Sequence, residues 1–229
     1  LILLGIYFIV YLIDSYRNND VKDFLKYLGV FILAGILSLG LNAPNILSTY
    51  DYSKYSTRSQ SELKLNPDGT EKQISTGLDY DYITQYSYGV FESLNLIAPR
   101  VQGGASSEDV GEDSDLYEFL IDNNVPKPQA DSFIKSVPTY WGSQPILEAP
   151  AYIGASVVFL FILSLFVVKG PFKWWLLISF VLSLLLSWGK NFPLLTNFFI
   201  DYIPFYNKFR AVSSIQVILE FAVPLLSVI

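Results

Sequence analysis

Two polar side chains interrupt an apolar run near the end of the sequence. Gln216 and Glu220 stand one helical turn apart within residues 213–229, which read SSIQVILEFAVPLLSVI. An ionisable group in an apolar helix is costly and normally faces a helical bundle or a polar cavity. Glu220 would lie about 10 Å along the helix from its first residue. The pair could line the floor of a cavity that opens outward, or Glu220 could form a hydrogen bond between helices.

Cations gather immediately before that run, in residues 200–214 with the sequence IDYIPFYNKFRAVSS. Lys208 and Arg210 could hold a lipid phosphate or pyrophosphate, because the arginine fork matches phosphate oxygens. Arg100 and Lys190 could join this cluster. The alternative is that these side chains anchor ordinary anionic headgroups at a membrane surface. The four cations are therefore candidate phosphate-binding residues.

Acidic candidates for catalysis are harder to choose. Asp79 and Asp81 form the best acid pair in the polar middle of the chain. If this stretch is helical, their side chains point about 200° apart. Asp79, Asp81 and Glu220 are the candidate catalytic acids, and no pair among them identifies a general base by itself. The catalytic residue stays unassigned.

Composition removes several classes of chemistry. The 229 residues include no Cys and no His, which excludes disulfides, thiol nucleophiles, histidine-ligated zinc and serine–histidine–aspartate triads. No cofactor is identified, and a divalent metal is left open. The chain is 52% hydrophobic and 16% charged, whereas soluble domains carry about 25% charged residues. It contains no Met, and both of its ends are apolar. We therefore expect an internal fragment of a larger membrane protein.

The apolar residues fall into five segments, namely residues 1–13, 24–41, 151–168, 172–188 and 213–229. A bilayer core requires roughly 20 apolar residues per helix. The alternative is a set of core helices in a soluble protein, but the segment AYIGASVVFLFILSLFVV at 151–168 has no polar face. The prediction is an all-α polytopic membrane protein. Residues 1–41 and 151–188 would each hold two spans, and residues 213–229 one more, with the first and last spans truncated.

Orientation follows from cations near the span ends. The connection 14–23 and the one after residue 168, with their flanks, carry five: Arg17, Lys22, Lys26, Lys169 and Lys173. These short connections are predicted to face the cytoplasm. Residues 42–150 and 189–212 would then lie outside a bacterial inner membrane. Residues 42–150 hold 16 acids and 7 bases, a net charge of −9. That charge indicates a solvated acidic face or attraction for cations, and it disfavours nucleic acid.

The external segment should be mainly helical or irregular. Residues 114–124 and 128–137 are predicted helices, with Ser114 and Asp131 as their caps. Residues 89–100 could form a re-entrant or interfacial helix, and residues 103–115 a flexible acidic loop. Tyr and Trp residues cluster beside carboxylates, as in many carbohydrate sites, where rings stack on sugars and acids accept hydroxyl hydrogen bonds. The alternative is that these aromatic residues seat the segment on the membrane.

Three stretches resemble a known family. They are LDYDYITQYSYGVFESLNLIAPR, PTYWGSQPILEAPAYIG and LLSWGKNFPLLTNFFIDYIPFYNKFRAVSSIQVIL. They look like the multi-spanning bacterial YfhO-type membrane proteins, and PFYNKFRAVSS is the most specific motif. The resemblance implies a GT-C-like bundle with a large external loop. It also implies sugar transfer from a polyprenyl-phosphate carrier to a cell-envelope polymer. In GT-C enzymes the principal catalytic acid lies in the first external loop, and we expect that loop to lie outside this chain.

The leading prediction is a lipid-carrier-dependent glycosyltransferase of the cell envelope. A polyprenyl-phosphate sugar donor would sit in the membrane lipid near Lys208 and Arg210, and a glycopolymer acceptor would approach from the external segment. The alternatives are a transporter or flippase of lipid-linked precursors, with Gln216 and Glu220 lining its pathway, and a non-catalytic assembly protein. A transporter would show repeated halves or broken paired helices.

Overall fold

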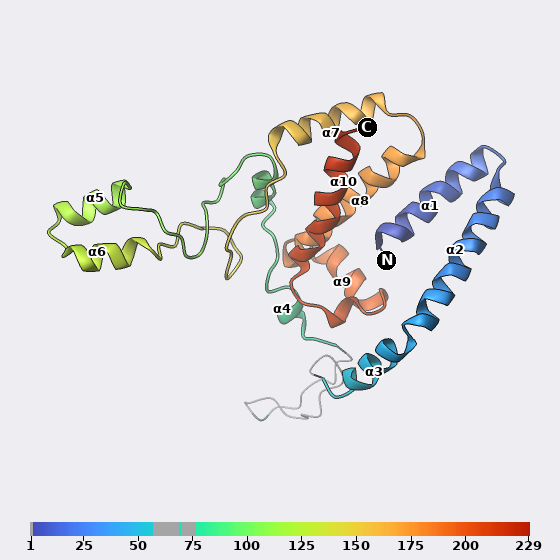
Figure 1. Ribbon diagram of the computed structural model, residues 1–229, viewed down its shortest axis with the longest axis horizontal. Coiled ribbons are helices and arrows are strands. Elements are labelled where there is room, and N and C mark those ends of the chain that lie inside the picture. The colour runs from blue at the N-terminus through green and yellow to red at the C-terminus, as the bar shows by residue number, and fades with distance from the viewer. Residues whose placement is uncertain (1, 57–68, 70–76) are drawn as a thin grey trace.

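The computed structural model describes residues 2–56, 69 and 77–229, and their regular structure is helical (Figure 1). The longer helices are α1 (Ile2–Arg17), α2 (Val21–Leu41), α3 (Ala43–Ser53), α7 (Ala155–Val167), α8 (Pro171–Ser187), α9 (Pro193–Tyr202) and α10 (Val217–Ser227). The shorter α-helices are α4 (Tyr80–Ile83), α5 (Asp115–Asp122) and α6 (Lys127–Ile134). The 3-10 helices are η1 (Phe91–Leu96), η2 (Gly189–Asn191), η3 (Tyr206–Lys208) and η4 (Val212–Gln216). The predicted all-α class is confirmed for the described residues.

Two short connections lie at the same end of the helices, the upper end in Figure 1. One joins α1 to α2 and the other joins α7 to α8. The two connections lie close together, because Arg17 of α1, Gly170 of the second connection and Trp174 of α8 line the same cavity. The chain leaves α2 and α8 at the opposite end. The five cations predicted to face the cytoplasm therefore belong to one end of the molecule.

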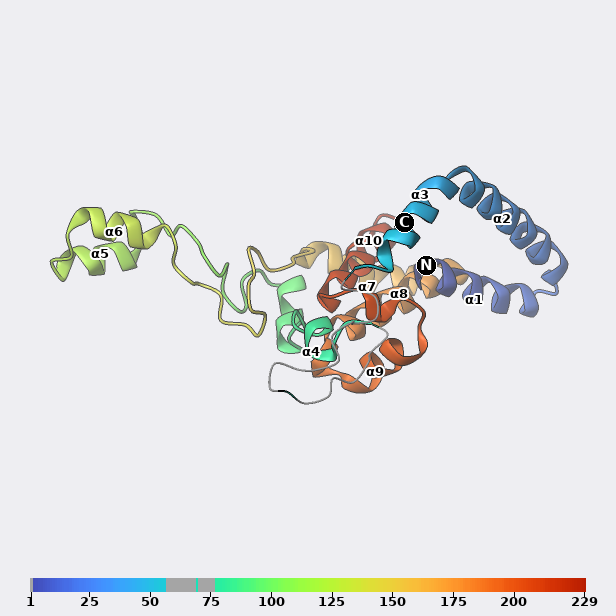
Figure 2. The same cartoon turned by 90° about the horizontal axis from the view of Figure 1, so that it is seen from below.

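Helices α5 and α6 form a hairpin that projects away from the other helices (Figures 1 and 2). The hydroxyl of Ser114 accepts a hydrogen bond from the Tyr117 backbone N–H at 3.3 Å, so the predicted N-cap of α5 is confirmed. The predicted cap at Asp131 is wrong. Helix α6 begins at Lys127 after Pro126, and Asp131 lies inside it, where it accepts a hydrogen bond from the Tyr117 hydroxyl at 2.9 Å. Proline suits a helix start because it lacks an N–H.

Two irregular segments lead into and out of this hairpin, and polar contacts join them at its base. Glu108 and Val137 form an isolated antiparallel bridge, and the Ser107 and Ser136 hydroxyls lie 2.8 Å apart. Residues 103–115, predicted to be a flexible acidic loop, thus include an ordered pairing at Glu108. These contacts join residues 29 positions apart in the sequence, and the hairpin beyond them buries Ala130 and Ile134 of α6.

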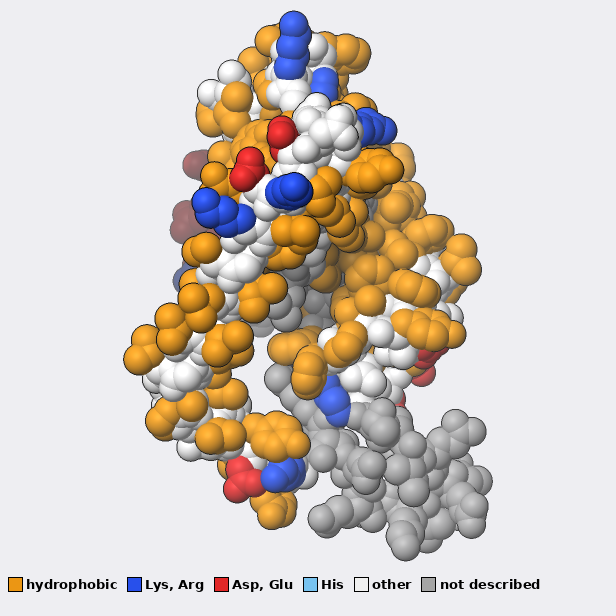
Figure 3. Space-filling model, turned by 90° about the vertical axis from the view of Figure 1, so that its right-hand side faces the viewer, with side chains coloured by type: hydrophobic (Ala, Val, Ile, Leu, Met, Phe, Trp, Pro, Cys, Tyr) orange, Lys and Arg blue, Asp and Glu red, His pale blue; other side chains and the backbone are white. Residues whose placement is uncertain are grey.

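Helix α2, like α3 after it, has no buried residue. Its large apolar side chains are exposed along most of its length, and Figure 3 shows hydrophobic side chains spread over the surface seen from this side. Among the described residues, α2 is the one helix long and apolar enough to cross a membrane. Shorter apolar helices cover Ala155–Val167, Pro171–Ser187 and Val212–Ser227. One such helix by itself is weak evidence for a membrane protein.

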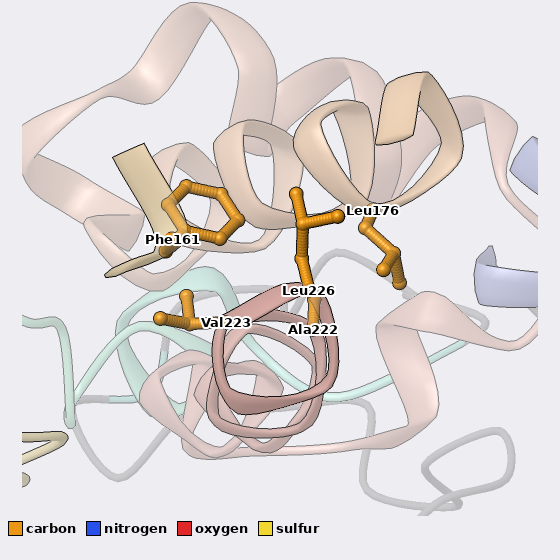
Figure 4. Packing of buried hydrophobic residues seen from close by; sticks show 5 residues of the cluster. All are labelled: Phe161, Leu176, Ala222, Val223 and Leu226. Atoms are coloured by element: carbon orange, nitrogen blue, oxygen red, sulfur yellow. The ribbon is translucent and has the colours of Figure 1, made fainter. Parts of the chain in front are cut away.

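The core of the bundle lies between α7, α8 and α10. Its buried side chains interdigitate across the three helices, as Figure 4 shows for Phe161, Leu176, Ala222, Val223 and Leu226. Helix α1 packs on α8, where the indole N–H of Trp175 donates a hydrogen bond to the Leu3 carbonyl at 3.0 Å. All five segments predicted to be apolar helices contain helix. The helix predicted at residues 151–168 is α7, and it starts at Ala155 because Gly154 before it has a φ of 111°.

Helix α8 also carries three buried serines on its inner side, at positions 179, 183 and 187. Each hydroxyl donates a 2.7 Å hydrogen bond to a backbone carbonyl three or four residues earlier in the same helix. The polar groups are therefore satisfied without a partner from another helix. Their small side chains leave room for α10 and η4 to pack against this face.

Candidate functional site

Two distant segments meet at the end of the bundle where α8 stops and η4 begins. The backbone N–H of Leu78 donates to the Asn207 carbonyl at 3.0 Å, that of Tyr88 to Ser187 at 2.8 Å, and that of Ser213 to Tyr86 at 3.2 Å. We call this region, residues 77–98 and 187–216, the junction. The sequence analysis predicts that both segments lie on the same side of a membrane, and the structure packs them together.

Gly189 allows the closest approach within the junction. Its φ is +49°, a left-handed conformation, and a Cβ atom at this position would overlap the Ser87 hydroxyl. That hydroxyl accepts a hydrogen bond from the Lys190 backbone N–H at 2.9 Å. The Gly189 carbonyl accepts one from Thr196 at 2.9 Å. A glycine is therefore required where α8 turns toward α9.

Arg210 is held against two aromatic rings of the other segment. Its Nη1 atom donates a hydrogen bond to the Tyr82 hydroxyl at 2.6 Å. Its guanidinium carbon lies 5.0 Å from the Tyr82 ring centroid and 5.4 Å from that of Tyr86. The hydrogen bond to Tyr82 is the main cause that raises the pKa of Arg210 above its ordinary value. We call these three residues the arginine clamp.

The clamp borders a cavity of about 360 Å³ that includes Tyr206, Arg210 and Ser214 among its lining residues. Burial raises the pKa of Tyr206 to about 12, so its hydroxyl stays protonated and can donate a hydrogen bond. Two non-glycine residues beside the cavity have left-handed backbones, Phe205 with φ 67° and Ala211 with φ 63°. Such conformations persist only where the surrounding structure holds them, and they concentrate at functional sites.

The other predicted phosphate-binding residues take different positions. Lys208 ends η3, next to the clamp, and Lys190 is exposed in η2 of the junction. Arg100 lies apart from the clamp residues, at the base of the hairpin. Its guanidinium forms a two-point ion pair with Glu108, with N–O distances of 2.7 and 2.9 Å. This pairing, with a further contact from Thr139, lowers the pKa of Glu108 to about 2.

Gln216 and Glu220 face different environments. Gln216 is buried, and its Nε2 atom donates to the Ser187 hydroxyl at 3.4 Å. Glu220 is exposed on α10. The candidate acids Asp79 and Asp81 are also exposed, one immediately before α4 and the other within it. Neither Gln216 and Glu220 nor the acid pair Asp79 and Asp81 is therefore buried together in this structure.

A buried carboxyl group in η1 was missed by the sequence reasoning. Glu92 is completely buried and accepts three hydrogen bonds, from the Gly89 backbone N–H at 2.9 Å, the Tyr140 hydroxyl at 2.8 Å and the Gln144 amide at 3.0 Å. We call Glu92 and these donors the Glu92 node. A signal is present in the sequence, since Glu92 interrupts an apolar stretch just as Glu220 does, but the prediction for residues 89–100 is only a re-entrant or interfacial helix.

Polar atoms around the node are incompletely paired. Within the described part of the chain, the Tyr88 hydroxyl and the Asn95 amide nitrogen are buried without a hydrogen-bond partner. Burial is the main cause that raises the pKa of Tyr88 above its ordinary value, and burial also raises the pKa of Tyr140 to about 12. Unpaired buried groups are costly, so this interior can take up a water or another polar group.

No group of three or more acidic side chains that could hold a metal ion occurs among the described residues. No family model, curated protein or solved structure matches this chain. The resemblance to YfhO-type proteins therefore stays a prediction.

Proposed function

We propose that this chain is part of a multi-pass GT-C-like protein of the bacterial inner membrane that transfers a sugar from a polyprenyl-phosphate carrier to a cell-envelope polymer. The observation that carries the proposal is the arginine clamp, a cation held by two tyrosines beside a cavity of about 360 Å³. The clamp lies at the start of the helix formed by η4 and α10, at the level where a lipid headgroup would sit.

The membrane part of the proposal is supported by two features. Helix α2 exposes apolar side chains along its length, and large exposed apolar surfaces mark interaction sites or contact with lipid. The five cations of the two short connections belong to the end opposite the junction, as the excess of Lys and Arg on the cytoplasmic side would require. Residues 42–150 and 189–212 would then lie outside.

In this proposal Arg210 holds the carrier phosphate. The two tyrosines can occupy only part of its five N–H donors, and the remaining donors can bind phosphate oxygens. Stacking on Tyr82 and Tyr86 fixes the guanidinium plane before the lipid arrives. As the sugar leaves, negative charge builds on the phosphate, and a fixed cation stabilises it. A carboxylate that acts as a general base would take the proton from the acceptor hydroxyl, and this role is not assigned to a residue of the chain.

Binding of farnesyl phosphate, a short polyprenyl phosphate, to the full chain in detergent micelles tests this role. We expect Arg210→Ala to weaken binding about tenfold or more, the scale of a lost charge-assisted hydrogen bond. Arg100→Ala is the matched control, because that arginine is paired with Glu108 outside the clamp, and it should bind as the wild type does. Equal affinity of Arg210→Ala and the wild type would contradict the proposal.

The topology has a separate test, because the chain has no native cysteine. Single variants Asn18→Cys and Ser132→Cys place a thiol in the α1–α2 connection and in the projecting hairpin. A membrane-impermeant thiol reagent applied to intact bacteria should label Ser132→Cys and leave Asn18→Cys unlabelled until the cells are lysed. The reverse pattern would contradict the orientation, and labelling of neither in a chain that purifies without detergent would contradict the membrane assignment.

A transporter of lipid-linked precursors is the second candidate. The buried pair Gln216 and Ser187 favours it, because polar side chains inside an apolar bundle often mark a substrate path. A transporter moves its lipid across the bilayer without consuming it. Flipping of a fluorescent polyprenyl phosphate in vesicles that contain the full chain would favour this candidate over the transferase.

A further inference from the structure

A cavity of about 450 Å³ lies between the end of α1 and the start of α8, at the end of the bundle opposite the junction (Figure 1). Its lining includes Val10, Ile13, Asp14 and Arg17 of α1 and Trp174 and Ile178 of α8. Its volume lies within the range of roughly 300–1,000 Å³ that small-molecule sites span. The proposed phosphate site uses none of these residues.

The lining changes from polar to apolar along both walls of this cavity. Arg17 is the last residue of α1, and Val10 lies about 10 Å along the helix from it at 1.5 Å per residue. On the other wall α8 begins at Pro171, and Ile178 lies about the same distance from that start. A ligand that matches both walls has a polar head and an apolar tail, as a membrane lipid does.

The polar end of the cavity holds one acid and one base. Asp14 and Arg17 stand three residues apart on α1, a spacing at which opposite charges can pair on a helix surface. They form no ion pair with each other, and in the described part of the chain the Arg17 guanidinium has neither a hydrogen bond nor an ion pair. The Asp14 carboxylate accepts a hydrogen bond from the Asn18 amide at 3.2 Å. Arg17 is exposed and Asp14 is half-buried, so a ligand can reach both charges.

The start of α8 gives this end a second preference for phosphate. Its first N–H groups have no carbonyl partner within the helix, and Gly170 and Pro171, where the helix begins, line the cavity. The partial positive charge of a helix start favours an anion. Together with Arg17 it provides a place for an anionic group, while Asp14 provides a separate place for a cation. The cavity at the clamp differs, because its described lining includes Arg210 and no acid.

We propose that this cavity binds a phospholipid whose zwitterionic headgroup ends in a primary ammonium, as in phosphatidylethanolamine. Arg17 binds the phosphate, and Asp14 accepts a hydrogen bond from the ammonium. Val10, Ile13 and Ile178 contact the acyl chains. An anionic lipid would bring negative charge to Asp14, and a choline headgroup has no N–H to donate. This inference rests on the membrane part of the proposed function and not on sugar transfer.

Native mass spectrometry of the full chain tests this selection of lipids. The protein is equilibrated in uncharged detergent micelles with equal amounts of phosphatidylethanolamine, phosphatidylcholine and phosphatidylglycerol that carry the same acyl chains. We expect the wild type to retain phosphatidylethanolamine about fivefold more than either of the other lipids, the scale of one net hydrogen bond.

Two variants separate the two charges. Arg17→Ala removes the phosphate contact and should retain all three lipids about fivefold less than the wild type does. Asp14→Ala leaves a cation without its acid, so its preference should move from phosphatidylethanolamine to phosphatidylglycerol. The matched controls are Asp23→Ala and Lys26→Ala, because these two exposed residues have the same spacing on α2 and do not line this cavity. Both controls should select lipids as the wild type does.

Equal retention of the three lipids by the wild type, or an unchanged selection in Asp14→Ala, would overturn the proposal. Arg210→Ala separates it from the transferase, since this variant should keep the lipid selection while losing farnesyl phosphate. A wild type that selects phosphatidylethanolamine through Asp14 but never binds farnesyl phosphate would support the lipid site and overturn the transferase proposal alone. A chain that purifies without detergent and retains no lipid would overturn both.

Discussion

Glu92 and the arginine clamp lie in the same junction, but their ionisable groups have opposite environments. Glu92 is fully buried, and neutral donors from two loops satisfy its oxygens. Arg210 is exposed, and a hydroxyl and two ring faces hold it. Removing a buried carboxyl group leaves its hydrogen-bond donors without an acceptor, whereas removing an exposed cation leaves no buried group unpaired. The node should therefore govern folding, and the clamp should govern binding.

The largest expected effect concerns the node. Glu92→Ala leaves three donors without their acceptor, one of them on the buried Gln144, and we expect a loss of about 3–5 kcal/mol in the free energy of unfolding. A denaturant titration of the purified chain measures it. Glu148→Ala is the control, because that side chain is exposed and its loss should change stability by less than about 0.5 kcal/mol. If the two variants are equally stable, the distinction between node and clamp fails.

The next effect concerns the backbone that joins the two centres. Gly189→Ala places a methyl group against the Ser87 hydroxyl in a left-handed conformation, and we expect a loss of about 2–3 kcal/mol. Gly29→Ala in α2 meets nothing within 4 Å and should be neutral or stabilising by up to about 1 kcal/mol. Ser87→Ala combined with Gly189→Ala should recover part of the loss. No recovery would mean that backbone strain and the overlap with the Val212 side chain cause the loss.

A smaller effect tests whether the Tyr82 hydroxyl of the clamp serves phosphate binding or stability. Tyr82→Phe keeps the ring under Arg210 and removes the hydroxyl that accepts its hydrogen bond. We expect farnesyl phosphate to bind about two- to fivefold more weakly, because the guanidinium is less firmly placed, with no change in stability beyond about 0.5 kcal/mol. Tyr52→Phe, at an exposed position in α3, should change neither quantity. A large loss of stability in Tyr82→Phe would make the clamp structural.

The smallest effect separates Arg100 from the clamp. The ion pair with Arg100 lowers the pKa of Glu108 from 4.5 to about 2. A lowered folded-state pKa stabilises the fold at pH values above 4.5, and this contribution fades as the pH falls from 4.5 toward 2. The protection factor of the Val137 amide against hydrogen exchange should fall over that range, because this amide donates to the Glu108 carbonyl at 3.0 Å. The pair is partly exposed, so the change should be small, and Arg100→Ala should remove it.

Much of the helical framework could be predicted from local sequence. Each apolar run contains a helix, and the Ser114 cap follows from its position before an amphipathic segment. The Asp131 cap failed because a proline just upstream starts the helix earlier. Arg100 was grouped with Lys208 and Arg210 by charge alone, since no sequence pattern reveals that Glu108 pairs with it across a turn.

The sequence by itself determined where the apolar helices form, because apolar runs and breakers such as Gly154 and Pro171 act over a few residues. It also determined that chemistry based on cysteine or histidine is absent. Only the tertiary structure decided that Tyr82 and Tyr86 hold Arg210, that Glu92 joins two loops, and that Gln216 faces inward while Glu220 faces outward. Those outcomes depend on contacts between residues far apart in the chain, and such contacts form only once the helices and loops have packed.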